Sequence, residues 1–394
     1  MKVKEIQHFL VNPGWGKNLL FVKVSTDNGI VGWGECYTQS DRDRSILMHL
    51  EHLSNYLVGR DPFEIKYFNQ IVFDDYSSRR GSMEIFSALS GLEQALWDIC
   101  GKYTKQPVYK LLGGPCRKKL RVYANGWYEG SKKPEHYAEK AKIAIARGFD
   151  ALKFDPIPGP FRSIVSKNNL RQGVETVRQV RNAVGEEVDL LIEIHRRFSP
   201  MTAIQFAQEI EEFKIFWYEE PCPAEFLDNL SEVRNSINIP TVTGEALYTK
   251  NDFPEVFSKR CADIINPDVA NTGGILELKE IASMAEAHQV AVSPHNYNST
   301  TIALAATLHA AITMPNFLIT EYFVPFEKIG KQISPNPMIP KDGYISLDET
   351  PGLGVELDEE KLSKFSYSEF PRTLPYPDNE GFYGGAWPDN LDAL

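Results

Sequence analysis

Residues 190–198 read LLIEIHRRF: an apolar run ends in a carboxylate, Glu193, and an imidazole, His195, follows two positions later. A short apolar run of this kind is typical of a buried strand. Seven similar runs occur between residues 120 and 321, and stretches with apolar residues at helical spacing separate them. The predicted strands are LRVYAN (120–125), ALKFD (151–155), DLLIEI (189–194), IFWYE (215–219), IPTVTGE (239–245), ADIINPD (262–268), VAVSPH (290–295) and FLITE (317–321).

Alternation of strands and helices favours parallel pairing through crossover helices, which places the chain in the α/β class. Eight such units are what a closed (β/α)8-type barrel requires, and we expect that barrel over residues 116–325. An open doubly wound sheet is the alternative. That fold would place a glycine-rich nucleotide turn after an early strand, and the sequence contains neither GxGxxG nor GxxxxGK[ST].

The residues on either side of the barrel read differently. Residues 1–115 predict an N-terminal α+β capping domain: three strands with a hairpin turn at DNG (27–29), then helices over 45–58 and 83–102. The LLGGP at 111–115 marks its boundary. Residues 326–394 are expected to pack back on the cap as a C-terminal segment, and to end in an extended arm from residue 371.

Composition excludes several kinds of partner. The 394-residue chain carries a net charge of −11 and has no run of Lys or Arg, so we expect it to bind no nucleic acid. It has no apolar stretch long enough to span a membrane and no signal peptide at residues 1–20, so we expect a cytoplasmic protein without membrane contact. Its five scattered cysteines form no CxxC pair and are expected to be reduced thiols.

Every predicted strand ends in a polar side chain. In barrels of this kind, the C-terminal strand ends carry the catalytic groups. One acidic residue after a strand more often caps the next helix or faces solvent, but Glu is a poor cap and four of these ends are Glu. The strand-end residues are Asn125, Lys153 with Asp155, Glu193 with His195, Glu219, Glu245, Asp268, His295 and Glu321.

Three of these glutamates, Glu193, Glu219 and Glu245, end successive strands, so their oxygens can converge on one point. Three carboxylates repel one another unless a cation lies among them. All-oxygen ligation selects a hard ion, and Mg²⁺ fits because it leaves positions for substrate oxygens. The alternative is three separately solvated carboxylates.

The next two strands place Asp268 beside His295. A carboxylate next to an imidazole fixes its tautomer and raises its basicity, so His295 is the candidate general base. Alternate residues of a strand point the same way, so His195 should share the face of Glu193 and also point into the site. The alternative for either histidine is a hydrogen-bonded core residue.

The chain resembles the enolase superfamily, in its mandelate-racemase-like branch of acid-sugar dehydratases. It is most similar to gluconate and galactonate dehydratases, in which a metal-ligand carboxylate is followed two residues later by a histidine and then an arginine, here Glu193, His195 and Arg197. The motifs that carry the resemblance are LLGG before the barrel, KFDP (153–156), YEEP (218–221), GE (244–245), NPDVANTGGI (266–275), SPH (293–295), TE (320–321) and PGLGVE (351–356).

The resemblance implies Mg²⁺-dependent dehydration of a sugar (aldonic) acid, D-gluconate or D-galactonate, to a 2-keto-3-deoxy acid. His295, oriented by Asp268, would remove the C2 proton, and His195 would protonate the departing 3-hydroxyl. Glu321 would bind the substrate carboxylate in a protonated or proton-sharing form. Relatives of this kind also imply a homo-oligomer. The residues expected to bind substrate are Lys153, Asp155, Arg197 and Glu321.

Two departures separate this chain from other members of the superfamily. Many relatives have Asp where this chain has Glu193, one methylene longer. Racemases carry a second lysine where this chain has Asp155, so a racemase or epimerase is disfavoured.

Other aldonic acids (xylonate, arabinonate, mannonate) stay open as substrates. A metal hydrolase would show HxH on the first barrel strand, which ends at Asn125, and a non-enzymatic descendant would have lost site groups that are all present here.

Overall fold

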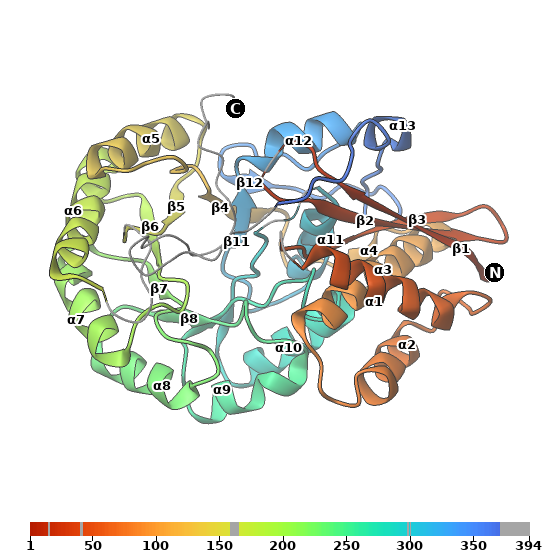
Figure 1. Ribbon diagram of the computed structural model, residues 1–394, viewed down its shortest axis with the longest axis horizontal. Helices are drawn as coiled ribbons and strands as arrows, with labels where there is room; N and C mark the ends of the chain where they lie inside the picture. The colour runs from red at the N-terminus through yellow and green to blue at the C-terminus, as the bar shows by residue number, and fades with distance from the viewer. Residues whose placement is uncertain (15, 40–41, 158–164, 298, 300, 371–394) are drawn as a thin grey trace.

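The computed structural model describes residues 1–14, 16–39, 42–157, 165–297, 299 and 301–370. Figure 1 shows a ring of helices around a curled sheet, with a second body packed against one side. The sheet contains all eight predicted strands, in sequence order around the ring. They are β4 (Leu120–Asn125), β5 (Ala151–Phe154), β6 (Asp189–Glu193), β7 (Trp217–Glu219), β8 (Thr241–Thr243), β9 (Ile264–Ile265), β10 (Ala291–Val292) and β11 (Thr320–Phe323).

Backbone hydrogen bonds close the ring. β11 pairs in parallel with β4, the first strand. On the other side of β11, the Leu318 amide donates to the Val292 carbonyl at 2.9 Å, and the Val292 amide donates to the Asn316 carbonyl at 2.9 Å. The predicted (β/α)8-type barrel is therefore confirmed, and the open doubly wound sheet is wrong.

Helices surround the sheet and separate it from solvent (Figure 1). Each follows one strand, and their bounds are α5 (Pro134–Ala146), α6 (Lys167–Val184), α7 (Pro200–Ile210), α8 (Leu227–Ser236), α9 (Pro254–Ser258), α10 (Ile275–Ala287), α11 (Thr301–Ala311) and α12 (Phe326–Ile333). The barrel interior has its own core, which includes Tyr123, Leu191, Trp217, Val242 and Ile319. This packed floor leaves the C-terminal strand ends as the place for a site.

The N-terminal body is the predicted α+β cap. Its antiparallel sheet has the order β1 (Val3–Val11), β2 (Leu19–Thr26), β3 (Val31–Cys36). Helices α1 (Asp43–Leu57) and α3 (Met83–Thr104) confirm the two predicted ones, while α2 (Ile65–Ile71), the π-helix Val72–Tyr76 and α4 (Val108–Leu111) were not predicted. Helix α3 lies so close to β3 that a Cβ on Gly34 would be 1.8 Å from the Gly91 carbonyl oxygen, so glycine is required there.

The described part of the C-terminal segment packs on the cap and on the barrel. Strand β12 (Tyr344–Ile345) pairs antiparallel with β4, and helix α13 (Glu359–Leu362) lies near the cap sheet (Figure 1). The Leu353 amide donates to Asp98 of α3 at 2.8 Å, and the Asn12 amide donates to the Ser366 carbonyl at 2.9 Å. The segment thus completes the cap. The boundaries at 115 and 325 stay predictions, and the arm predicted from residue 371 lies outside the described residues.

His309 on α11 joins three parts of this architecture. Its Nδ1 accepts from the Tyr109 amide of α4 at 3.1 Å, and its Nε2 is 3.1 Å from the Leu353 carbonyl of the C-terminal segment. Only the neutral ring satisfies both partners. Burial lowers the pKa of His309 to about 4, so the folded chain binds fewer protons there than the unfolded chain does.

We therefore expect stability to fall as the pH drops below the unfolded pKa of about 6.5 towards the folded pKa of His309. Between about pH 7.5 and about pH 5 the loss from this one group is about 2 kcal/mol, at about 1.4 kcal/mol per pKa unit. Urea unfolding of wild type and His309→Gln at both pH values measures it, with exposed His136→Gln as the control. Equal pH dependence in all three proteins would contradict the assignment.

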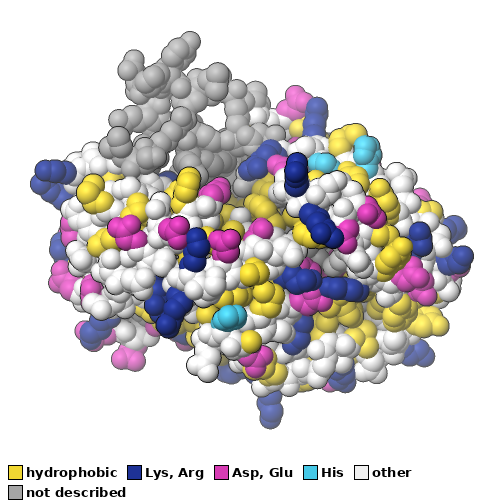
Figure 2. Space-filling model, turned by 90° about the horizontal axis from the view of Figure 1, so that it is seen from below, with side chains coloured by type: hydrophobic (Ala, Val, Ile, Leu, Met, Phe, Trp, Pro, Cys, Tyr) yellow, Lys and Arg dark blue, Asp and Glu magenta, His cyan; other side chains and the backbone are white. Residues whose placement is uncertain are grey.

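Among the described residues, no helix is both long and apolar enough to cross a bilayer. On the face seen in Figure 2, basic and acidic side chains are interspersed.

Candidate active site

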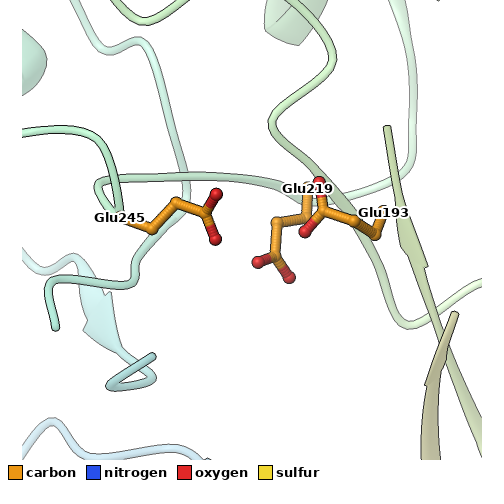
Figure 3. A group of neighbouring side chains, drawn as sticks. All are labelled: Glu193, Glu219 and Glu245. Carbon is orange, nitrogen blue, oxygen red and sulfur yellow. The ribbon is translucent and has the colours of Figure 1, made fainter. Parts of the chain in front are cut away.

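Three glutamates, two of them buried and Glu245 partly buried, converge at the C-terminal end of the barrel. Glu193 ends β6, Glu219 ends β7, and Glu245 follows β8 by two residues. One carboxylate oxygen of each lies within 4.8 Å of the others. Figure 3 shows Glu245 approaching from one side and Glu193 and Glu219 from the other. The convergence predicted from the strand ends is present in the structure.

Cations surround this group of carboxylates. Lys153 on β5 is fully enclosed, with its Nζ 2.8 Å from Glu219 and 3.5 Å from Glu193. Arg196 pairs with Glu245 on the other side. Burial opposes a low pKa of Glu245, but the positive charges of His295 and Arg196 hold it well below its usual value. Burial raises the pKa of Glu193 to about 7 and raises the pKa of Glu219 well above its usual value.

The residues present fit a divalent metal ion. Glu193 Oε2 is buried and has no hydrogen-bond partner among the described residues. The raised pKa values of Glu193 and Glu219 have burial as their main cause, and a cation between the three carboxylates would offset that cost. Carboxylate oxygens alone are the ligands of a hard cation.

Asp268 and His295 form the predicted pair. Their backbones are bridged in parallel, and His295 Nδ1 lies 2.7 Å from Asp268 Oδ2. The other ring nitrogen, Nε2, points at Glu245 Oε2 at 2.9 Å. Although burial lowers it, the charges of Glu245 and Glu321 raise the pKa of His295 well above its usual value. One nitrogen is thus held by Asp268 and the other faces the carboxylate group.

A second Asp–His pair lies across the barrel. His195 Nδ1 is 3.1 Å from Asp155 Oδ2, and the same Asp155 oxygen is paired with Arg197. Asp155 was expected to bind substrate, but in the structure it holds these two side chains. Burial raises the pKa of Asp155, yet the neighbouring charges of Arg197 and His195 lower it overall. Arg197 is 7% exposed, so it is a buried cation rather than a surface one.

The route by which His195 reaches the site differs from the predicted one. Strand β6 ends at Glu193, so the alternation of an extended strand does not position His195. Instead, His195 and Arg196 have left-handed backbone, with φ of 53° and 65°, and the His195 amide donates to Glu193 Oε1 at 2.6 Å. This tight turn lets the ring contact Asp155, the residue that follows the neighbouring strand β5.

Glu321 lies on the floor of the site beside Lys153. It accepts hydrogen bonds from Asn125 and from the Asn296 amide, and its Oε2 is 3.6 Å from Lys153 Nζ. Burial raises the pKa of Glu321, but the charges of Lys153 and His295 lower it overall. These charges favour the ionised form of Glu321, and the protonated or proton-sharing form implied by the resemblance stays a prediction.

Several residues that contact the site were not assigned from sequence. Asn266 and Trp217 donate to Glu219 at 2.9 and 3.0 Å. The second glutamate of the EEP motif, Glu220, accepts from the Thr243 hydroxyl at 2.7 Å and lies 3.5 Å from Arg196. Asn266 begins the NPDVANTGGI motif and Glu220 lies in the YEEP motif, so the sequence contained a signal for both residues.

The cap also contributes to the site. Tyr37 follows β3, and its amide donates to the Ala270 carbonyl of the barrel at 3.1 Å. The Nζ of Lys17, a buried residue, lies 5.5 Å from the centroid of the Tyr37 ring. Burial raises the pKa of Tyr37; the charge of His295 opposes this rise, and the charges of Glu245 and Asp268 add to it. Sequence could not place these cap residues because their position depends on how the two bodies dock.

Comparison with known families agrees with this geometry. Residues 136–361 match the family described as "Enolase C-terminal domain-like", and residues 15–113 match "Mandelate racemase / muconate lactonizing enzyme, N-terminal domain". The chain belongs to the enolase superfamily. The first match covers the barrel after β4 and continues into the C-terminal segment, and the second covers most of the cap.

Named relatives of this enolase-superfamily chain include a "D-gluconate dehydratase" of Thermoproteus tenax, 33% identical over 95% of this chain and 75% of that protein. A "D-gluconate/D-galactonate dehydratase" of Picrophilus torridus is 34% identical over 92% of both chains. Among solved structures, a "Member of the Enolase Superfamily" from Salmonella Typhimurium has a TM-score of 0.87 at 31% identity, covering 93% of this chain and 98% of that one.

Proposed function

We propose that the chain is a Mg²⁺-dependent dehydratase that converts an aldonic acid, D-gluconate or D-galactonate, to its 2-keto-3-deoxy acid. Dehydratases of these two acids are among its named relatives. The observation that carries the proposal is a pair of Asp–His units, Asp155–His195 and Asp268–His295, on opposite sides of one group of carboxylates.

Their positions suit a β-elimination. His195 follows β6 and His295 follows β10, which lie four strands apart in a ring of eight. A substrate between them therefore meets one imidazole on each face. One can take a proton from C2 while the other gives a proton to the oxygen leaving C3.

The roles follow from the partners of each ring. Asp268 accepts a hydrogen bond from the Nδ1–H of His295. Nε2 faces Glu245 at 2.9 Å, and a cation held by Glu245 would lower the raised pKa of His295 and free Nε2 to remove the C2 proton. Asp155 holds His195 through Nδ1, which leaves its Nε2 to protonate the departing 3-hydroxyl. Water leaves, and the resulting enol becomes the 2-keto acid.

The substrate carboxylate is placed by charge. Lys153 is the buried ammonium beside the carboxylate group, and Arg197 adds a second cation near His195. Glu193, Glu219 and Glu245 would hold Mg²⁺, which supplies positive charge for the negative charge that develops when C2 loses its proton, the general chemistry of enolase-superfamily sites. The same residues support xylonate, arabinonate or mannonate as alternative substrates.

A racemase or epimerase is the less favoured function. Such an enzyme needs a second base on the face opposite His295, and the lysine that serves as this base in racemases is absent. Asp155 occupies that position and is paired with His195 and Arg197. We further propose that the protein acts as a homo-oligomer in the cytoplasm, as expected from sequence.

Incubation with Mg²⁺ and a panel of aldonic acids tests the proposal. Semicarbazide detects the 2-keto-3-deoxy product, and NMR detects any epimer. We expect product from D-gluconate or D-galactonate and none after EDTA treatment. An epimer without dehydration, or no reaction with any acid of the panel, would contradict it.

Asp155→Asn is expected to separate the two proton transfers. Without its carboxylate the ring of His195 loses the partner that orients it, so dehydration slows by about 10- to 100-fold, a part of what a general acid contributes. Exchange of the C2 proton with D₂O depends on His295 and should stay within about twofold of wild type. Equal loss of both rates would instead indicate general damage to the site.

A further inference from the structure

Glu129 is a buried acid that the proposed mechanism does not use. It lies on the loop that joins β4 to α5 and is only 8% exposed. Both of its carboxylate oxygens are buried without a hydrogen-bond partner among the described residues. The hydroxyl oxygen of Ser131 on the same loop is also buried without a hydrogen-bond partner among the described residues. Burying a hydrogen-bond acceptor without a partner costs free energy. An unpaired buried acceptor in a native protein therefore indicates a place where a water, an ion or a ligand binds.

The loop is anchored beside the active site. Trp127 Nε1 donates to the Lys153 carbonyl at 2.9 Å, and the Trp127 ring contacts Phe154 edge to face at 5.5 Å. Lys153 is the buried lysine of the carboxylate group, so the loop covers the C-terminal end of its strand. Lys140 reaches the same loop but donates to the Glu129 backbone carbonyl rather than to its carboxylate.

Tyr297 connects Glu129 with the catalytic groups. Its ring centroid is 6.2 Å from that of His295. After burial, the charge of Glu129 is the largest influence that raises the pKa of Tyr297, ahead of Tyr37, Glu321 and Glu245. The Tyr297 ring therefore lies beside His295, and its hydroxyl is within electrostatic range of Glu129 and of the site carboxylates. It stays protonated and can donate a hydrogen bond.

We propose that Glu129 and the Tyr297 hydroxyl form a subsite for the hydroxyl groups beyond C4 of a six-carbon sugar acid. This inference rests on the proposed function. With the substrate carboxylate beside Lys153 and C2 and C3 between the two histidines, the rest of the carbon chain extends towards the rim of the barrel. Its hydroxyls supply the hydrogen-bond partners that both Glu129 oxygens lack.

Calorimetric binding in a His295→Asn background tests the subsite without turnover. D-gluconate is compared with L-threonate, which has the same C2 and C3 configurations but lacks C5 and C6. Adding Glu129→Leu should weaken gluconate binding by about tenfold, because hydrogen bonds to this buried carboxyl, whose pKa burial raises to about 9, are lost. Glu129→Gln keeps one hydrogen-bond acceptor, so its affinity for gluconate should lie between that of the His295→Asn background and that of Glu129→Leu in the same background. Threonate binding should change by less than about threefold.

The control is Glu135→Gln, an exposed glutamate at the start of α5. Thermal unfolding gives a second readout: Glu129→Leu should raise the Tm, since an unpaired buried carboxyl is removed. Unchanged gluconate affinity in Glu129→Leu, or equal losses for gluconate and threonate, would overturn the subsite while the dehydratase stands. If the background binds no sugar acid and the wild type dehydrates none, the proposed function fails instead.

Discussion

Replacing His295 by Asn is expected to lower kcat for dehydration by about a thousandfold or more, within the range that a general base contributes. The reason is geometric: Nδ1 is held by Asp268 at 2.7 Å, so Nε2 is the nitrogen left to take the C2 proton. Exchange of that proton with D₂O should be lost together with dehydration, while KM changes little. Both rates are measured by NMR on the same sample.

His195→Asn is the matched control, because it alters the other imidazole and leaves Asp268–His295 intact. We expect it to abolish dehydration and keep C2 exchange. If the His195 variant loses exchange and the His295 variant keeps it, the assignment of base and acid is reversed. If both variants keep wild-type dehydration, neither histidine acts as proposed.

Removing the metal or one of its proposed ligands is expected to have the second large effect. Glu219→Gln keeps the hydrogen-bonding shape of the side chain but removes one of three negative charges. Mg²⁺ affinity, measured by calorimetry, should fall by about two orders of magnitude, because affinity at oxygen sites depends on the number of charged ligands. Activity should vanish with EDTA and return with added Mg²⁺.

The control here is Glu225→Gln, an exposed glutamate in the loop after β7. It should bind Mg²⁺ as the wild type does. Wild-type Mg²⁺ affinity in the Glu219 variant would contradict the role given to the three carboxylates, and activity that survives complete chelation would contradict metal dependence.

The parts of the site that sequence could predict depend on strand ends. Glu193, Glu219 and Glu245 each follow a short apolar run, and consecutive parallel strands of a barrel bring their ends to one rim. The same rule placed Asp268 beside His295. These are local patterns whose position follows once the barrel is assumed, so a single sequence was sufficient to find them.

Other contacts depend on geometry that a sequence does not display. The pairing of Asp155 with His195 requires left-handed backbone at His195 and Arg196, which few non-glycine residues adopt. Tyr37 and Lys17 reach the site only because the cap docks on the barrel. Glu129 reads as an ordinary loop glutamate, and only its burial without partners distinguishes it.

The way the C-terminal segment completes the cap has a consequence for biosynthesis. Helix α3 and the residue that follows β1 find hydrogen-bond partners in Leu353 and Ser366, which lie near the end of the described chain and leave the ribosome late. Contacts so distant along the chain form late and slowly. A nascent cap therefore stays incomplete during translation, and premature termination upstream of residue 353 would yield a product with exposed apolar surface that chaperones and proteases recognise.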